Sequence, residues 1–225
     1  MSKQAAEMLY KQIKLDIRHN RLPVAQALKQ EELSQRYNIS RIPIRDVLQR
    51  LKNEGWLTTC GKRGVMIPEL NATEAEDLYL MRKYLEPLIL GYAIPNLNQQ
   101  TIGKATDYLQ TIDAQTDDPN QHMSIEEHGE LNWQFHACLY QQANRPTLFN
   151  TIASLHQLCG RYIGFHNQQL DYLATSQQDH YNLLKAIENK DIPHAKSLLE
   201  AHISDAGETL VAFLVDESKD SAEME

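Results

Sequence analysis

The sequence is poor in cysteine, with three among 225 residues and no C-x-x-C pair. Cys60, Cys138 and Cys159 are an odd and widely spaced set, which argues against a disulfide framework. No apolar run approaches the roughly 18 residues that a membrane span needs, and the amphipathic N-terminus does not resemble a signal peptide. The sequence therefore predicts a reduced, cytoplasmic protein without a membrane partner, whose cysteines are small buried hydrophobic residues.

Positive charge is scarce beyond the N-terminal third of the chain. The net charge is −8. Residues 1–68 hold 13 Lys and Arg against 6 Asp and Glu, whereas residues 69–225 hold 9 against 24. A basic segment fused to an acidic one is typical of a protein that binds phosphate groups with one domain only. The charge distribution therefore predicts two domains with different tasks.

The segment 33–64 has the pattern of a short helix, a tight turn, a second helix and a two-stranded hairpin. Asn38 tolerates a left-handed turn, and Ser40 is a good N-cap. Pro43 falls in the first helical turn, where a missing N–H costs no hydrogen bond. Apolar residues follow at helical spacing: Ile44, Val47, Leu48 and Leu51. The pattern predicts a winged helix-turn-helix, with strands near 56–59 and 65–67.

The other face of the second helix carries Arg41, Arg45 and Gln49, which are spaced four residues apart. Guanidinium groups in this position can enter a major groove and bind guanine through two hydrogen bonds. Lys62 and Arg63, at the hairpin tip, are placed for a minor-groove or phosphate contact. Arginines on a surface helix can also be merely solvated, but the turn, the cap and the hairpin together favour double-stranded DNA as the partner.

The remainder of the chain reads as helices separated by proline-containing breaks. A capping box, Thr73-x-x-Glu76, opens the first of them. The helical periods predict a mainly α protein, in which an antiparallel bundle of about six helices follows the winged helix. The predicted boundaries are 1–68 for the DNA-binding domain, 69–72 for a linker, 73–216 for the helical domain and 217–225 for an acidic, disordered tail.

Three predicted helices each carry one histidine in an apolar stripe, namely His136, His180 and His202, and Asn132 lies one turn before the first. Inward-facing histidines on neighbouring helices of a bundle are a common way to build a metal site. A histidine on an apolar face is, however, more often a hydrogen-bonded core residue. The pattern alone therefore leaves a metal site and a polar core as alternatives.

The N-terminal motif resembles the GntR family of bacterial transcription regulators. The resemblance rests on Leu22-Pro23, Glu32-Leu33, Ser40 to Leu48, Arg50-Leu51, Glu54-Gly55-Trp56 and Arg63-Gly64. It implies a DNA-contacting set that consists of Arg41, Ile42, Arg45, Gln49, Lys62, Arg63 and Gly64. Ile42 departs from the threonine that is common in the family, which removes a hydroxyl group that could contact a phosphate or a base.

Residues 73–215 resemble the FCD domain of the FadR subfamily. The resemblance rests on Arg82 with Leu85-Glu86-Pro87, on Phe135-His136, on His180 and on His202-Ile203. Many members hold a divalent metal, often zinc, with one Asp and three His. The resemblance maps these ligands onto Asn132, His136, His180 and His202, so an uncharged amide replaces the carboxylate. It also makes Arg82 and Arg161 candidates to bind a small carboxylate effector, although each could equally form an ordinary salt bridge.

The resemblance implies a transcription regulator, and we expect a repressor of a metabolic operon. It would bind a near-palindromic operator as a homodimer, because one winged helix reads only a short half-site. A metal-dependent enzyme fused to a DNA-binding module is one alternative. The stripes around the three histidines contain no Glu or Asp that could serve as a general base, so we expect no enzymatic activity. A regulator with a metal-free pocket for an acyl chain is the other alternative.

Overall fold

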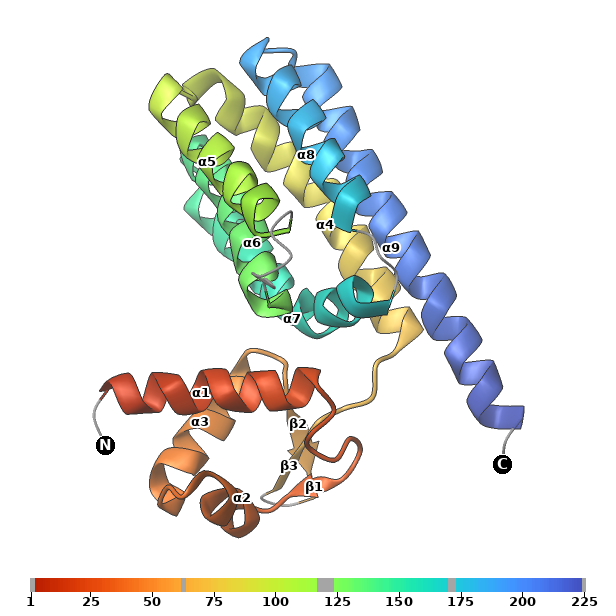
Figure 1. The fold of residues 1–225 in the computed structure, drawn as a ribbon. Helices are drawn as coiled ribbons and strands as arrows, with labels where there is room; N and C mark the ends of the chain where they lie inside the picture. Colours follow the sequence, from red (N-terminus) through yellow and green to blue (C-terminus); the bar gives the residue numbers. More distant parts are fainter. Residues whose placement is uncertain (1–2, 62–63, 117–123, 170–172, 224–225) are drawn as a thin grey trace. The chain divides into compact units, whose positions relative to one another are not determined.

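A computed structural model of the chain describes residues 3–61, 64–116, 124–169 and 173–223. The chain divides into two compact units, Met1–Leu70 and Asn71–Glu225. The described residues form nine α-helices, two short 3-10 helices and three strands (Figure 1). None of the described helices is both long enough and apolar enough to cross a membrane.

The N-terminal unit is a winged helix-turn-helix, as its sequence predicted. Its helices are α1 (Lys3–Arg18), α2 (Gln30–Tyr37) and α3 (Arg41–Asn53). Its antiparallel sheet has the order β1-β3-β2 and consists of β1 (Ala27–Leu28), β2 (Thr58–Cys60) and β3 (Gly64–Met66). The strand β1 was not predicted, because two residues are too few to show an alternating pattern.

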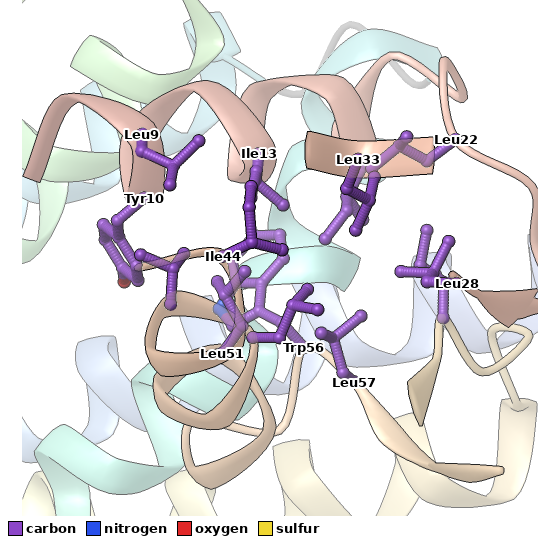
Figure 2. Packing of buried hydrophobic residues seen from close by; sticks show 14 residues of the cluster. Leu9, Tyr10, Ile13, Leu22, Leu28, Leu33, Ile44, Leu51, Trp56 and Leu57 are labelled. Atoms are coloured by element: carbon purple, nitrogen blue, oxygen red, sulfur yellow. The ribbon is translucent and has the colours of Figure 1, made fainter. Parts of the chain in front are cut away.

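One hydrophobic core holds this unit together, and Figure 2 shows side chains from its helices and loops pointing toward one another. Ile13 of α1 and Ile44 and Leu51 of α3 are fully buried, and Trp56 is 1% exposed. The stripe predicted for α3 is therefore the buried face. Its burial in a core shared with α1 orients the opposite face of α3, with its arginines, toward solvent.

The turn between α2 and α3 has the predicted left-handed residue, since Asn38 has φ 52° and ψ 43°. Ser40 occupies the N-cap position of α3 in an extended conformation, but its side chain makes no capping hydrogen bond. The buried carboxylate of Asp16 on α1 accepts hydrogen bonds from Tyr37 (2.8 Å) and Arg36 (3.3 Å) of α2. Asp16 thereby attaches the first helix of the motif to α1.

The described residues of the C-terminal unit form six α-helices, in agreement with the predicted bundle. They are α4 (Ala72–Ala93), α5 (Gln99–Thr116), α6 (Ile125–Tyr140), α7 (Pro146–Gln169), α8 (Leu173–Glu188) and α9 (Ile192–Glu223), with 3-10 turns at Ile94–Asn96 and Gln141–Ala143. The helix α4 packs against α9, as α5 does against α6 (Figure 1). Gly207 permits a close approach between α4 and α9, because a Cβ there would lie 2.7 Å from the Cβ of Tyr79.

Two helix ends differ from the sequence prediction. The helix α4 begins after Asn71, whose side chain accepts the N–H of Glu74 at 3.0 Å, so the predicted capping box at Thr73 is wrong. Asn71 and Glu74 have the same spacing two residues earlier, and Asn is preferred to Thr at an N-cap. At the other end, α9 continues to Glu223 through most of the predicted disordered tail. Extending an existing helix needs no new nucleus, so an acidic segment can remain helical.

Candidate DNA-binding surface and metal centre

The outward face of α3 carries the side chains that the sequence predicted to contact DNA. Arg41 and Arg45 have 62% and 66% of their side chains exposed, and Gln49 is also exposed. Ile42, between the arginines, is 67% exposed, which is unusual for a large aliphatic residue. An apolar side chain on such a face can contact the methyl group of thymine. The helix therefore presents groups of two kinds that can read bases.

The arginines of this face have only weak partners within the protein. Arg41 lies 2.7 Å from Glu31, and Arg45 lies 3.7 Å from Asp46. Ion pairs between exposed side chains contribute about 0–1 kcal/mol, so phosphate or guanine can displace them at small cost. Arg50, on the same helix, differs because its guanidinium binds both Glu7 (2.7 Å) and Glu54 (3.0 Å). The charge of Arg50 is thus used in ion pairs within the N-terminal unit.

The hairpin of the wing depends on glycine at its ends. Gly61 has φ 60°, a left-handed conformation that glycine adopts without strain. A Cβ on Gly64 would lie 2.6 Å from the carbonyl oxygen of Cys60, so Gly64 allows β2 and β3 to pair closely. Lys62 and Arg63, the predicted contacts at the tip, lie outside the described residues.

In the C-terminal unit, His136 of α6, His180 of α8 and His202 of α9 come together. They offer ligand nitrogens that all lie within 4.8 Å of one another. Nε2 of His136 is 3.1 Å from Nε2 of His180, and the imidazole of His202 has its centroid 4.8 Å from that of His180. His136 and His180 are 2% and 1% exposed. Three helices therefore contribute to one buried cluster.

The distances in this cluster suit a metal ion. Two nitrogens bound at 2.0–2.1 Å to one ion can be at most about 4.2 Å apart. The His136–His180 contact of 3.1 Å meets this condition, and the ligand nitrogens of all three histidines lie within 4.8 Å of one another. Asn132 is half-buried on α6, four residues before His136, so both side chains project to the same side of the helix.

Burial keeps two of these imidazoles neutral. It lowers the pKa of His136 well below the usual 6.5, and the neighbouring His180 and His202 lower it further. Burial likewise lowers the pKa of His180, with His202 and His128 adding to the effect. A neutral imidazole has the lone pair that a metal needs, so protons compete with a metal for these two residues only in more acidic solution than for an ordinary histidine.

The structure adds partners of the histidines that sequence reasoning missed. The hydroxyl of Tyr140 lies 3.2 Å from Nδ1 of His136 and donates to Oε2 of Glu86 at 2.8 Å. Nδ1 of His202 lies 3.1 Å from Oδ2 of Asp179. Tyr140 follows His136 by four residues, which was the only available signal. Glu86 lies on α4, which carries none of the three histidines, so the residue spacing around the histidines gave no indication of it.

The two candidate effector arginines occupy different surroundings. Arg82 is buried on α4, and its Nε donates to Oε1 of Glu86 at 2.6 Å. Arg82 therefore forms the salt bridge that the sequence left open as an alternative to effector binding. It also lies within electrostatic reach of His136, whose pKa it lowers. Arg161 lies on α7, where burial lowers its pKa while Tyr162 and Glu74 act in the opposite direction.

The helix α4 has a second apolar face that points to solvent. Its side chains are between 41% and 64% exposed and belong to Leu80, Met81, Tyr84, Leu88 and Tyr92. Four of them recur every four residues and therefore form one stripe. Leu78 and Ile89 of the same helix are, by contrast, buried. An exposed apolar stripe of this kind is typical of an interaction surface.

Comparison with known proteins agrees with both units. Residues 5–67 match the model of "Bacterial regulatory proteins, gntR family", and residues 77–205 match that of the FCD domain. The Nta operon transcriptional regulator of Aminobacter aminovorans is 26% identical over 178 residues, which cover 78% of this chain and 80% of that protein. The transcriptional repressor RspR of Escherichia coli is 20% identical over 206 residues, which cover 91% and 88%.

The fold also matches a solved structure. The chain of McbR/YncC from E. coli superposes with a TM-score of 0.74 at 18% identity, covering 93% of this chain and 98% of that one. At this identity the match establishes the fold alone. The matched families and relatives are transcriptional regulators, which confirms that the chain is a regulator rather than an enzyme.

Proposed function

The chain belongs to the GntR family of bacterial transcription regulators and carries an FCD domain, and we propose that it represses a metabolic operon under the control of a small carboxylate. In this proposal the carboxylate binds beside a divalent metal, zinc in the first instance, in the C-terminal unit. The similarity to RspR, which is named a repressor, supports repression rather than activation.

The observation that carries the proposal is the convergence of three imidazoles in a buried part of the helical unit. His136, His180 and His202 would hold the ion, with Asn132 as a further, uncharged ligand. Imidazole suits zinc and similar divalent ions. A bound zinc ion would supply a positive charge that attracts a carboxylate, and the uncharged ligands would leave that charge undiminished.

Arg82 and Arg161 remain the proposed additional anchors for the carboxylate. Arg82 already shares its charge with Glu86, with Nε and Oε1 only 2.6 Å apart. The metal would therefore provide most of the attraction for an anion. This arrangement predicts an effector whose binding needs both a carboxylate group and the metal.

The proposal is tested by measuring how the full chain binds fluorescently labelled DNA from upstream of its own gene. With zinc present, we expect one member of a panel of mono-, di- and tricarboxylates to weaken binding about 5- to 150-fold, the range of typical coupling energies. Chelation of zinc by EDTA should abolish this response. Release by a long-chain acyl compound in the presence of EDTA would instead establish the metal-free alternative.

We also propose that the protein acts as a homodimer and that the exposed stripe of α4 is the dimer surface. A helix that is apolar on both sides is stable in water only when both sides are covered. A second copy is the partner that a near-palindromic operator requires. Aromatic residues such as Tyr84 and Tyr92, which are 64% and 44% exposed, are enriched in interfaces of this kind.

Replacing both Tyr84 and Leu88 with aspartate is expected to give a monomer, because two carboxylates would then be buried without partners in the interface. Light scattering at micromolar concentration measures the mass directly. The matched control is Val215→Asp, which alters an apolar residue of α9 that is 37% exposed and should leave the dimer intact. A wild-type protein that is monomeric both alone and on DNA would refute the dimer itself.

A further inference from the structure

The chain Arg82–Glu86–Tyr140–His136 forms a continuous line of buried hydrogen bonds that ends at the histidine cluster. Its three links measure 2.6, 2.8 and 3.2 Å. Glu86 is 1% exposed, Tyr140 1% and Arg82 6%, so water does not compete for these bonds. Arg82 and Glu86 lie on α4, whereas Tyr140 and His136 lie on α6.

The direction of each bond follows from the hydrogens that are available. The carboxylate of Glu86, paired with a guanidinium, has no hydrogen to give and accepts from Tyr140. Tyr140 has a single O–H, which is thereby used, so its oxygen can only accept from His136. Nδ1 of His136 must then carry the proton. In a neutral imidazole, Nε2 is consequently left with the lone pair.

That lone pair points into the cluster, since Nε2 of His136 lies 3.1 Å from Nε2 of His180. A second carboxylate acts in the same way on another member. Asp179 faces Nδ1 of His202 at 3.1 Å, which places the proton on Nδ1 and the lone pair on Nε2. His180 differs, because its buried Nδ1 has no hydrogen-bond partner among the described residues.

We propose that Glu86, acting through Tyr140, and Asp179 are positioning residues that hold His136 and His202 in the tautomer required for metal binding. The two outer carboxylates thereby compensate for the absence of a carboxylate at Asn132. Because Nε2 of His136 has the lone pair in its contact with His180, the proton of that contact is on Nε2 of His180. This proton must move to Nδ1 of His180 when a metal binds. This inference rests on the metal site of the proposed function. In it, the ion pair with Arg82 fixes the position of the Glu86 carboxylate.

The test uses the full-length protein with Tyr140→Phe, which removes one hydroxyl and keeps the ring. Zinc affinity, measured by competition with a chromophoric chelator, is expected to fall about 10- to 100-fold, the usual effect of losing an outer partner of a ligand histidine. Asp179→Ala should cause a loss of similar size. The matched control is Tyr162→Phe, since Tyr162 donates to Glu74 of the same helix α4 at 2.5 Å and is not a member of the Arg82–Glu86–Tyr140–His136 chain. Its zinc affinity should be unchanged.

A second measurement reports the tautomer itself and needs no metal. Nitrogen-15 NMR of the metal-free wild type should show His136 protonated at Nδ1, and Tyr140→Phe should lose this preference. Protonation at Nε2 in the wild type, or an unchanged zinc affinity in folded Tyr140→Phe, would overturn the proposal. A wild type that binds no zinc but shows Nδ1–H at His136 would refute the metal site while retaining the hydrogen-bonded chain. The two failures are therefore distinguishable.

Discussion

Replacing His180 with alanine is expected to abolish tight zinc binding and the thermal stabilisation that zinc provides. His180 is 1% exposed and lies 3.1 Å from His136, so alanine at this position leaves the proposed site with two imidazoles instead of three. A ligand at 100 times its dissociation constant stabilises the folded state by about 2.7 kcal/mol. Because 1 kcal/mol shifts the midpoint of a domain of this size by roughly 2–4 °C, the expected zinc-dependent shift is about 5–11 °C in the wild type and near zero in the variant.

The measurement compares midpoints with zinc and with EDTA for each protein. Truncation of a buried imidazole leaves a cavity that lowers both midpoints equally, so only the difference between them reports the metal. His194→Ala, on the exposed start of α9, is the matched control and should keep the full shift. An undiminished shift in His180→Ala would show that zinc binds elsewhere and that the three histidines form a polar core.

Asn132→Asp is expected to strengthen the same metal site. Asn132 lies one turn before His136, and a carboxylate there would give the ion a charged ligand. Zinc affinity, and with it the thermal shift, should increase. An unchanged affinity would place residue 132 outside the coordination sphere and leave three imidazoles as the whole ligand set.

The fold followed from the sequence wherever a local rule and the packing agreed. Asn38 marked the turn because few residues tolerate positive φ, and Ile44 and Leu51 marked the buried face of α3 because they repeat at the helical period. The start of α4 was misplaced because Thr73 and Glu76 have the spacing of a capping pair, and so do Asn71 and Glu74 two residues earlier. Asn is preferred to Thr at an N-cap, and Asn71 is the residue that caps the helix.

The candidate site was only partly predictable. Each histidine of the cluster was visible as a polar residue in an apolar stripe, which is a local signal. The link from Tyr140 to Glu86 joins residues 54 positions apart, and no periodicity marks such a pair. The exposed stripe of α4 could not be predicted from the sequence either, but for a different reason. Apolar residues occur around most of this helix, so the sequence did not reveal that Tyr84 and Leu88 lie outside the core.

Replacing Arg45 with alanine is expected to weaken binding to the operator by about 1–3 kcal/mol, which corresponds to roughly 5- to 150-fold in the dissociation constant. Its side chain is 66% exposed on the outward face of α3, and its nearest acidic partner, Asp46, is 3.7 Å away. A guanidinium so weakly held is available to bind guanine. The loss should appear as relaxed base preference at one position of each half-site, measured by fluorescence anisotropy on operator variants.

Arg50→Ala is the matched control, because it removes the same charge from the same helix. Arg50 is bound by Glu7 and Glu54, so its replacement should affect the stability of the N-terminal unit more than its base preference. Lys62→Ala in the wing should weaken binding to all sequences alike and lower the salt dependence by about one phosphate contact. If Arg45→Ala left the base preference intact while Arg50→Ala altered it, a different face of α3 would enter the groove. The assignment of Arg41, Ile42, Arg45 and Gln49 as the face that contacts bases would then be wrong.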